Sequence, residues 1–162
     1  MASDTTDPEE LMHQRRKARE IALQVLYELD VLDIDATEAI SIFWNYFGAP
    51  EESRKFSTFL IEGACDKKEE IDSLISSCSD NWSLARMSRV DRNILRMAVY
   101  ELLYCPDIPP KVTLNEAIDL GKLYGSENSG SFINGILDAV YLKLYKDEAD
   151  KKINGLTGSS HS

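Results

Sequence analysis

The amino-acid sequence predicts an all-α protein of about seven helices, and three observations support this. Apolar residues recur at intervals of three and four along nearly the whole chain, which is the spacing of one helix face. No segment alternates apolar and polar residues between hairpin turns, so there is no β-strand signal. No proline interrupts the chain between Pro50 and Pro106, as a run of three consecutive helices requires.

Four of these helices are predicted in the first half of the chain. Their apolar stripes occupy residues 18–29, 39–47, 56–64 and 71–78. The second stripe is stopped by Gly48 and Pro50, because neither residue type continues a helix well. The polar run Ser79-Asp80-Asn81 ends the fourth stripe.

Three more helices are predicted in the second half. Their stripes occupy residues 94–103, 114–121 and 133–144. Prolines that begin at Pro106 end the first of them, and Gly125 closes the second. Two start signals agree with these boundaries. Ser88 followed by Asp91 resembles a capping box, and Thr113 followed by Glu116 matches that pattern better.

The chain has the size and composition of one globular domain. It has 162 residues, of which 43% are hydrophobic and 28% charged. Both ends are polar or rich in glycine and serine, so we expect residues 1–9 and 147–162 to be disordered and residues 10–146 to form the domain. The first residues lack the order of a signal peptide, and no apolar run is long enough to span a bilayer. We therefore expect a soluble, cytoplasmic protein.

The sequence offers little for catalysis or metal binding. Cys65, Cys78 and Cys105 are odd in number, with 12 and 26 residues between successive members, which fits neither a disulfide framework nor a zinc site. We expect reduced, mostly buried thiols. The two histidines, His13 and His161, lie in segments that do not favour a pocket wall. We therefore predict no enzyme activity, no metal and no cofactor.

Positive charge is concentrated in one short segment of an acidic chain. The chain has 18 Lys and Arg against 28 Asp and Glu, a net charge of −10, so its whole surface should not bind nucleic acid. Residues 13–19 nevertheless contain four cations and no acid. These four, which we term the basic turn, are Arg15, Arg16, Lys17 and Arg19. Placed at the start of a helix they would oppose its macrodipole, so they indicate phosphate contact, with a solvated basic turn as the alternative.

Other cationic and aromatic residues leave two interpretations open. A second basic patch surrounds Asp91 and consists of Arg86, Arg89, Arg92 and Arg96. It fits either nucleic-acid contact or salt bridges within the protein. Tyr27 and Phe132 either stack on unpaired bases or belong to the core. The Gly/Ser-rich segment 125–131 either holds a phosphate or only connects two helices.

Three stretches of the chain resemble the NusB family of bacterial transcription antitermination factors. They are residues 15–27, residues 90–102 with their continuation at 108–118, and residues 132–138. The resemblance implies two packed helical subdomains. It also implies binding of boxA, a short single-stranded RNA element, together with NusE, a small-subunit ribosomal protein. With other Nus factors, this pair acts on RNA polymerase to suppress premature termination, notably in ribosomal RNA operons.

The resemblance assigns roles to seven residues of this sequence. The family's RNA-contacting arginine-rich motif falls on Arg15, Arg16, Lys17 and Arg19. Its phenylalanine near the RNA falls on Phe132, and Tyr27 and Asp91 match positions of the NusE contact. An acidic body would suit a basic ribosomal protein.

Two other functions are alternatives for this sequence. A helical protein-interaction module without an RNA role would leave the basic turn solvated. A similar helical domain also precedes RNA cytosine methyltransferases, but that enzyme needs several hundred further residues. Since the chain ends at residue 162, we expect no methyltransferase.

Overall fold

A computed structural model describes residues 7–32, 34–46, 48, 51–80 and 82–159. These residues form seven α-helices and one short 3-10 turn, with no strand among them, which confirms the predicted all-α class. The elements are α1 (Pro8–Val31), α2 (Ala36–Tyr46), α3 (Glu51–Asp66), α4 (Lys68–Ser77), η1 (Leu84–Arg86), α5 (Arg89–Tyr104), α6 (Pro110–Tyr124) and α7 (Ser129–Ser159).

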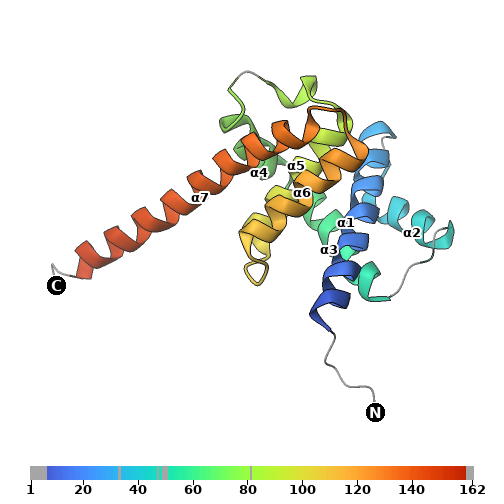
Figure 1. The fold of residues 1–162 in the computed structure, drawn as a ribbon, viewed down its shortest axis with the longest axis horizontal. Helices are drawn as coiled ribbons and strands as arrows, with labels where there is room; N and C mark the ends of the chain where they lie inside the picture. Colours follow the sequence, from blue (N-terminus) through green and yellow to red (C-terminus); the bar gives the residue numbers. More distant parts are fainter. Residues whose placement is uncertain (1–6, 33, 47, 49–50, 81, 160–162) are drawn as a thin grey trace, which may run out of the picture.

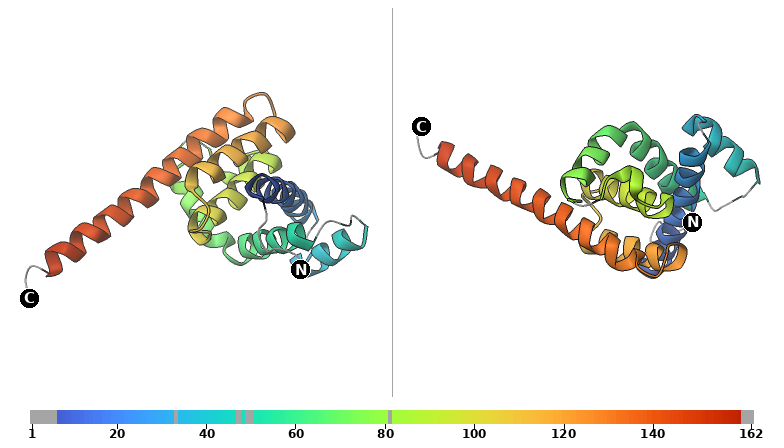
Figure 2. Two further views of the ribbon diagram at one scale, coloured as in Figure 1. Left: turned by 60° about the horizontal axis from the view of Figure 1, so that its bottom comes forward. Right: turned by 90° about the horizontal axis from the view of Figure 1, so that it is seen from above.

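The helices form two groups that meet at α5. Helices α1, α2 and α3 pack on one another, whereas α4, α6 and α7 pack around α5 (Figure 1). Helix α5 also contacts α1 and α3, so it joins the two groups. Its side chains Ile94, Leu95 and Val99 are fully buried, as a helix packed on several sides requires. The C-terminal part of α7 projects away from the other helices (Figure 2).

The two predicted capping signals have different outcomes. The first is confirmed, because the Asp91 backbone N–H donates to Ser88 Oγ over 3.1 Å at the start of α5. The second is wrong. Helix α6 begins earlier, at Pro110, which suits a first helical position because it needs no hydrogen-bond partner for a missing N–H. Thr113 lies inside the helix, where its hydroxyl donates to the Glu101 carboxylate over 3.2 Å.

Helical structure extends into both expected tails. Helix α1 begins at Pro8, with Glu9 and Glu10 in its first turn, where acidic side chains favour the helix macrodipole. Helix α7 continues to Ser159, and no proline follows Pro110 in the chain to end it. The remainder of the two segments, residues 1–6 and 160–162, lies outside the described residues. The boundaries of the domain at residues 10 and 146 stay predictions.

All three cysteines are free thiols, as expected. Cys105 is buried, and Cys65 and Cys78 are half-buried. Burial raises the pKa of Cys105 to about 11, so this thiol is protonated at neutral pH. Among the described helices, none is long and apolar enough to cross a membrane.

Candidate functional site

The basic turn lies within α1, not at its start. Because α1 begins at Pro8, the first of the four cations is in the second or third turn of the helix. The field of the helix ends fades within the first turn, so the macrodipole argument for an anionic ligand does not apply here. The position of each side chain must be judged from its own contacts.

Arg19 is a buried residue that binds within the protein. Its guanidinium donates to the two Glu101 oxygens over 2.8 and 2.7 Å. Only 2% of Arg19 and 1% of the Glu101 side chain are exposed. The Phe56 ring covers the guanidinium at 5.4 Å. This placement disagrees with the RNA contact expected for Arg19, because its hydrogen-bonding fork is already occupied and no solvent reaches it.

Arg16 points toward α6, and Arg15 toward α3. Arg16 donates to both oxygens of Glu116 over 3.1 Å each. This hydrogen bonding, with the charge of Glu116, raises the pKa of Arg16 above its ordinary value. Arg15 lies over the Phe56 ring at 5.4 Å and 3.7 Å from Asp107. Both arginines stay partly exposed. Arg15 and Arg19 therefore contact the same ring on α3, whereas Arg16 is directed toward α6.

Lys17 is the cation of the basic turn that is exposed and makes no ion pair among the described residues. It lies on the wall of a groove of about 350 Å³ between α1, the start of α5 and the end of α6. Tyr27, Val90 and Tyr124 line the same groove, which we term the tyrosine groove. Tyr27 is 37% exposed, so it is not a core residue. The structure thus brings together a predicted RNA residue and a predicted partner residue.

Asp91 directly follows Val90, a residue that lines the tyrosine groove, in the chain. It is 9% exposed, and its Oδ1 atom is buried with no hydrogen-bond partner among the described residues. A buried carboxylate oxygen without a donor is unfavourable by about 1–3 kcal/mol or more. The protein itself covers this oxygen, so the partner contact expected for Asp91 does not follow from it and stays a prediction.

Phe132 is half-buried near the start of α7. One part of its ring packs on the core, and it also contacts the Trp82 ring at a centroid distance of 6.2 Å. Trp82 was not among the residues predicted from the sequence. Its signal was a tryptophan outside every apolar stripe, in a connection between two helices. Phe132 therefore combines a packing contact with an exposed aromatic neighbour.

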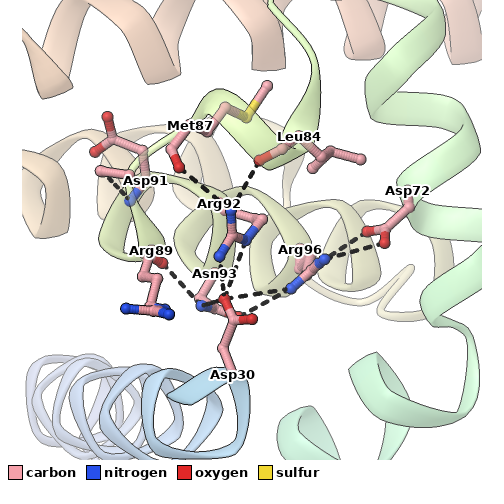
Figure 3. Close-up of polar contacts among 10 residues, drawn as sticks. Asp30, Asp72, Leu84, Met87, Arg89, Asp91, Arg92, Asn93 and Arg96 are labelled. Carbon is pink, nitrogen blue, oxygen red and sulfur yellow. Dashed lines mark hydrogen bonds and ion pairs between the residues drawn. The ribbon is translucent and has the colours of Figure 1, made fainter.

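The second basic patch divides into two paired and two exposed arginines. Arg92 donates to Asp30 over 3.0 and 2.7 Å, and Arg96 donates to Asp72 over 2.8 and 3.1 Å. Figure 3 shows Arg92 reaching the carbonyls of Leu84 and Met87 as well. For these two arginines, the salt-bridge interpretation is confirmed.

Arg86 and Arg89, by contrast, are exposed, and neither has an ion pair within the described part of the chain. In the residues that the structure describes, no group of three or more His, Cys, Asp or Glu is arranged to hold a metal ion.

Comparison with known proteins identifies relatives over most of the chain. The model of the NusB family matches residues 16–142. The transcription antitermination protein NusB of Syntrophus aciditrophicus is 63% identical over 145 residues, which cover 90% of each chain. NusB of Desulfatibacillum aliphaticivorans is 48% identical over 142 residues, covering 87% of this chain and 99% of that protein.

Solved structures show the same fold. The structure of T. maritima NusB is 39% identical, with a TM-score of 0.73, and covers 78% of this chain and 89% of its own. A crystal structure of the antitermination factors NusB and NusE in complex with dsRNA contains a chain that is 31% identical. Its TM-score is 0.74, and the match covers 82% of this chain and 98% of that one.

Proposed function

Because this chain belongs to the NusB family, we propose that it is a transcription antitermination factor that binds boxA-type single-stranded RNA together with NusE. In this role it joins other Nus factors on RNA polymerase and suppresses premature termination, notably in ribosomal RNA operons. The observation that carries the proposal is the similarity over most of the chain to a NusB solved with NusE and RNA. The protein acts by binding rather than catalysis, in the cytoplasm.

On the RNA side, we assign phosphate contact to Lys17, Arg15 and Arg16. Lys17 is exposed and without an ion pair among the described residues, so no bond has to break before it meets a phosphate. The other two retain exposed guanidinium surface beside their carboxylate partners. Arg19 instead anchors the basic turn to α5 through its buried ion pair with Glu101. Phe132 supplies an aromatic surface for a base.

On the protein side, we assign the NusE contact to Tyr27 and Asp91. Tyr27 on α1 lines the tyrosine groove, and Asp91 lies in the first turn of α5, directly after the lining residue Val90. Asp91 is 9% exposed, so its negative charge would act on a basic partner at the edge of the contact. The net charge of −10 favours a basic partner.

The proposal is tested by a fluorescence titration of a boxA-type RNA, with and without NusE, at two salt concentrations. Each phosphate neutralised on a single strand contributes a log–log slope of roughly −0.7. Lys17→Gln should therefore reduce the magnitude of the slope by about 0.7 and weaken matched and unmatched RNA alike. Lys146→Gln, which removes an exposed cation far along α7, is the matched control and should leave the slope unchanged.

For the partner contact, Asp91→Lys should abolish co-purification with NusE while circular dichroism stays helical. The substitution places a cation against a basic protein. Unchanged NusE affinity would refute the assignment.

One observation favours the alternative function, a protein-interaction module without an RNA role. Arg15, Arg16 and Arg19 have carboxylate partners within the protein, so three of the four cations of the basic turn are already paired. In that case the titration would detect NusE binding but no RNA binding at either salt concentration.

A further inference from the structure

Trp82 lies on the connection between α4 and η1, and 51% of its surface is exposed. Its ring meets the Phe132 ring at a centroid distance of 6.2 Å with an angle of 78° between the planes. In such an edge-to-face pair, one ring turns its edge toward the face of the other, so broad ring faces stay uncovered by the partner. The pair therefore offers open aromatic surface at the molecule's exterior.

We infer that Trp82 and Phe132 together form a stacking site for an unpaired RNA base, and that Arg86 contacts a neighbouring phosphate. This inference rests on the proposed RNA binding and extends it to a second segment of the chain. Stacking requires an accessible ring face and tolerates any base, because every base has a π-face. The half-exposed Trp82 meets that requirement better than Phe132, which packs partly on the core.

The charge around the pair favours RNA over a protein partner. The segment from Trp82 to Val90 contains Arg86 and Arg89 and no acidic residue. Both arginines are exposed and have no ion pair among the residues described, whereas Arg92 and Arg96 are held by carboxylates. A basic protein would be repelled by the charge of Arg86, and a phosphate backbone would be attracted.

The position of Arg89 is a separate indication of an anionic ligand. It is the first residue of α5, where a cation opposes the helix macrodipole. No carboxylate in the described residues pairs with it. A phosphate bound beside this turn would offset the unfavourable charge.

The first experiment measures RNA affinity in the presence of NusE for the full chain and its variants. Trp82→Ala should weaken boxA-type RNA by roughly 5- to 150-fold, the usual effect of losing one stacked base, and leave the salt slope intact. Trp82→Phe should restore most of the affinity. Arg86→Gln should instead reduce the slope magnitude by about 0.7. Trp44→Phe, a change to the other tryptophan on α2, is the control and should change neither quantity.

The second experiment separates direct stacking from support of Phe132. In Trp44→Phe, Trp82 is the single tryptophan of the chain, since the sequence has two. BoxA-type RNA should quench its emission in the NusE-bound protein, measured against NusE and RNA alone. In a Phe132→Ala background, a Trp82 that stacks on the base is still quenched at saturating RNA. A Trp82 that only positions Phe132 is not, and that result would overturn the inference.

The remaining outcomes also decide the matter. If the parent protein binds RNA and Trp82→Ala binds it equally well, the stacking site is wrong while the proposed function stands. If Trp82→Ala loses affinity for NusE instead, this surface contacts the protein partner, and the inference is again overturned. If the parent protein itself binds no RNA with NusE present, the proposed function fails first. The melting temperature of each variant checks that the fold is retained.

Discussion

At the scale of single residues, Arg19 shows how a basic residue of the predicted RNA-contacting segment can serve the fold. Its guanidinium lies between the Glu101 carboxylate and the Phe56 ring, out of contact with solvent. Thr113 donates a further hydrogen bond to the same carboxylate. The pair joins α1 to α5, so it holds the basic turn in place.

We expect Arg19→Met to destabilise the protein by about 3–5 kcal/mol in urea unfolding, because it leaves the Glu101 charge buried without its partner. Arg19→Met combined with Glu101→Met should recover much of the loss, since no unpaired charge then remains. Lys17→Met is the control and should change the free energy of unfolding by less than about 0.5 kcal/mol. If Arg19→Met were fully stable but bound RNA weakly, Arg19 would be an RNA contact after all.

The sequence could predict where the basic turn lies but not what its members contact. Arg19 and Glu101 are 82 positions apart in the chain, so no local pattern links them. Arg16 and Glu116 are 100 positions apart. Helical spacing indicates which residues share a face of one helix, whereas the identity of the facing helix depends on the whole fold. Phe132 and Tyr27 were placed on the correct helices for the same local reason.

At the scale of helices, the contact between α3 and α5 depends on one glycine. A Cβ atom at Gly63 would overlap the ring of Tyr100 on α5. That ring also packs against Phe59 at 5.4 Å and Tyr104 at 5.1 Å, so it has little room to move. A small residue at position 63 therefore sets how closely the two groups of helices approach.

We expect Gly63→Ala to lower the free energy of unfolding by about 1–3 kcal/mol, the usual effect of overpacking a core. Gly135→Ala is the matched control, because nothing lies within 4 Å of a Cβ placed there. In the middle of α7, that change should instead stabilise by roughly 0.8–1 kcal/mol, since alanine favours a helix more than glycine. Thermal and urea unfolding of both variants measure whether each change lowers or raises the free energy of unfolding. An equal effect in both would contradict the close-contact argument.

The end of the long helix gives a second test at this scale. Leu144 is the last residue of α7 that packs on the core among the side chains described, and the helix then projects away from the body (Figure 2). We expect a chain that stops after Lys146 to have an unchanged free energy of unfolding and unchanged RNA and NusE affinity. Limited proteolysis should cut the full chain between residues 147 and 162 first. A clear loss of stability on truncation would place the domain boundary beyond residue 146.

A helix boundary could be predicted from a capping pattern only where the side chains of that pattern make the capping hydrogen bond in the structure. The Ser88 hydroxyl caps α5, as its spacing to Asp91 indicates. Thr113 has the same spacing to Glu116, yet both side chains point to other helices, toward Glu101 and Arg16. The preceding Pro110 starts the helix three residues earlier. A capping pattern is thus a weak signal when a proline just before it offers another start.

At the scale of the whole molecule, one polar network joins elements from both groups of helices. Asp30 at the end of α1 accepts hydrogen bonds from Arg92 and Asn93 on α5, and Arg96 connects it to Asp72 on α4 (Figure 3). Each acid faces an arginine, so the network is close to neutral inside a chain of net charge −10. It orients the start of α5, next to the proposed partner and RNA contacts.

The network also predicts how stability depends on pH. Burial alone would raise the pKa of Asp30, but hydrogen bonds from Arg92 and Asn93, together with the positive charges of Arg92 and Arg96, lower it below the usual 3.8. A carboxyl whose pKa is lower in the folded state stabilises the protein above its ordinary pKa. That stabilisation is lost as the pH falls through the folded-state value.

We therefore expect the contribution of Asp30 to the free energy of unfolding to be constant above about pH 5 and to fall progressively below about pH 4. Asp30→Asn should be less stable than the parent at pH 7, because Arg92 loses its charged acceptor. Its acid limb should also be shallower, since one proton-linked group is gone. Asp138→Asn, a change at an exposed acid on α7, is the control and should follow the parent curve. Urea unfolding from pH 7 to pH 3 measures all three curves. If the Asp30→Asn curve ran parallel to that of the parent, the lowered pKa of Asp30 would not contribute to stability, and the acid sensitivity of the fold would lie elsewhere.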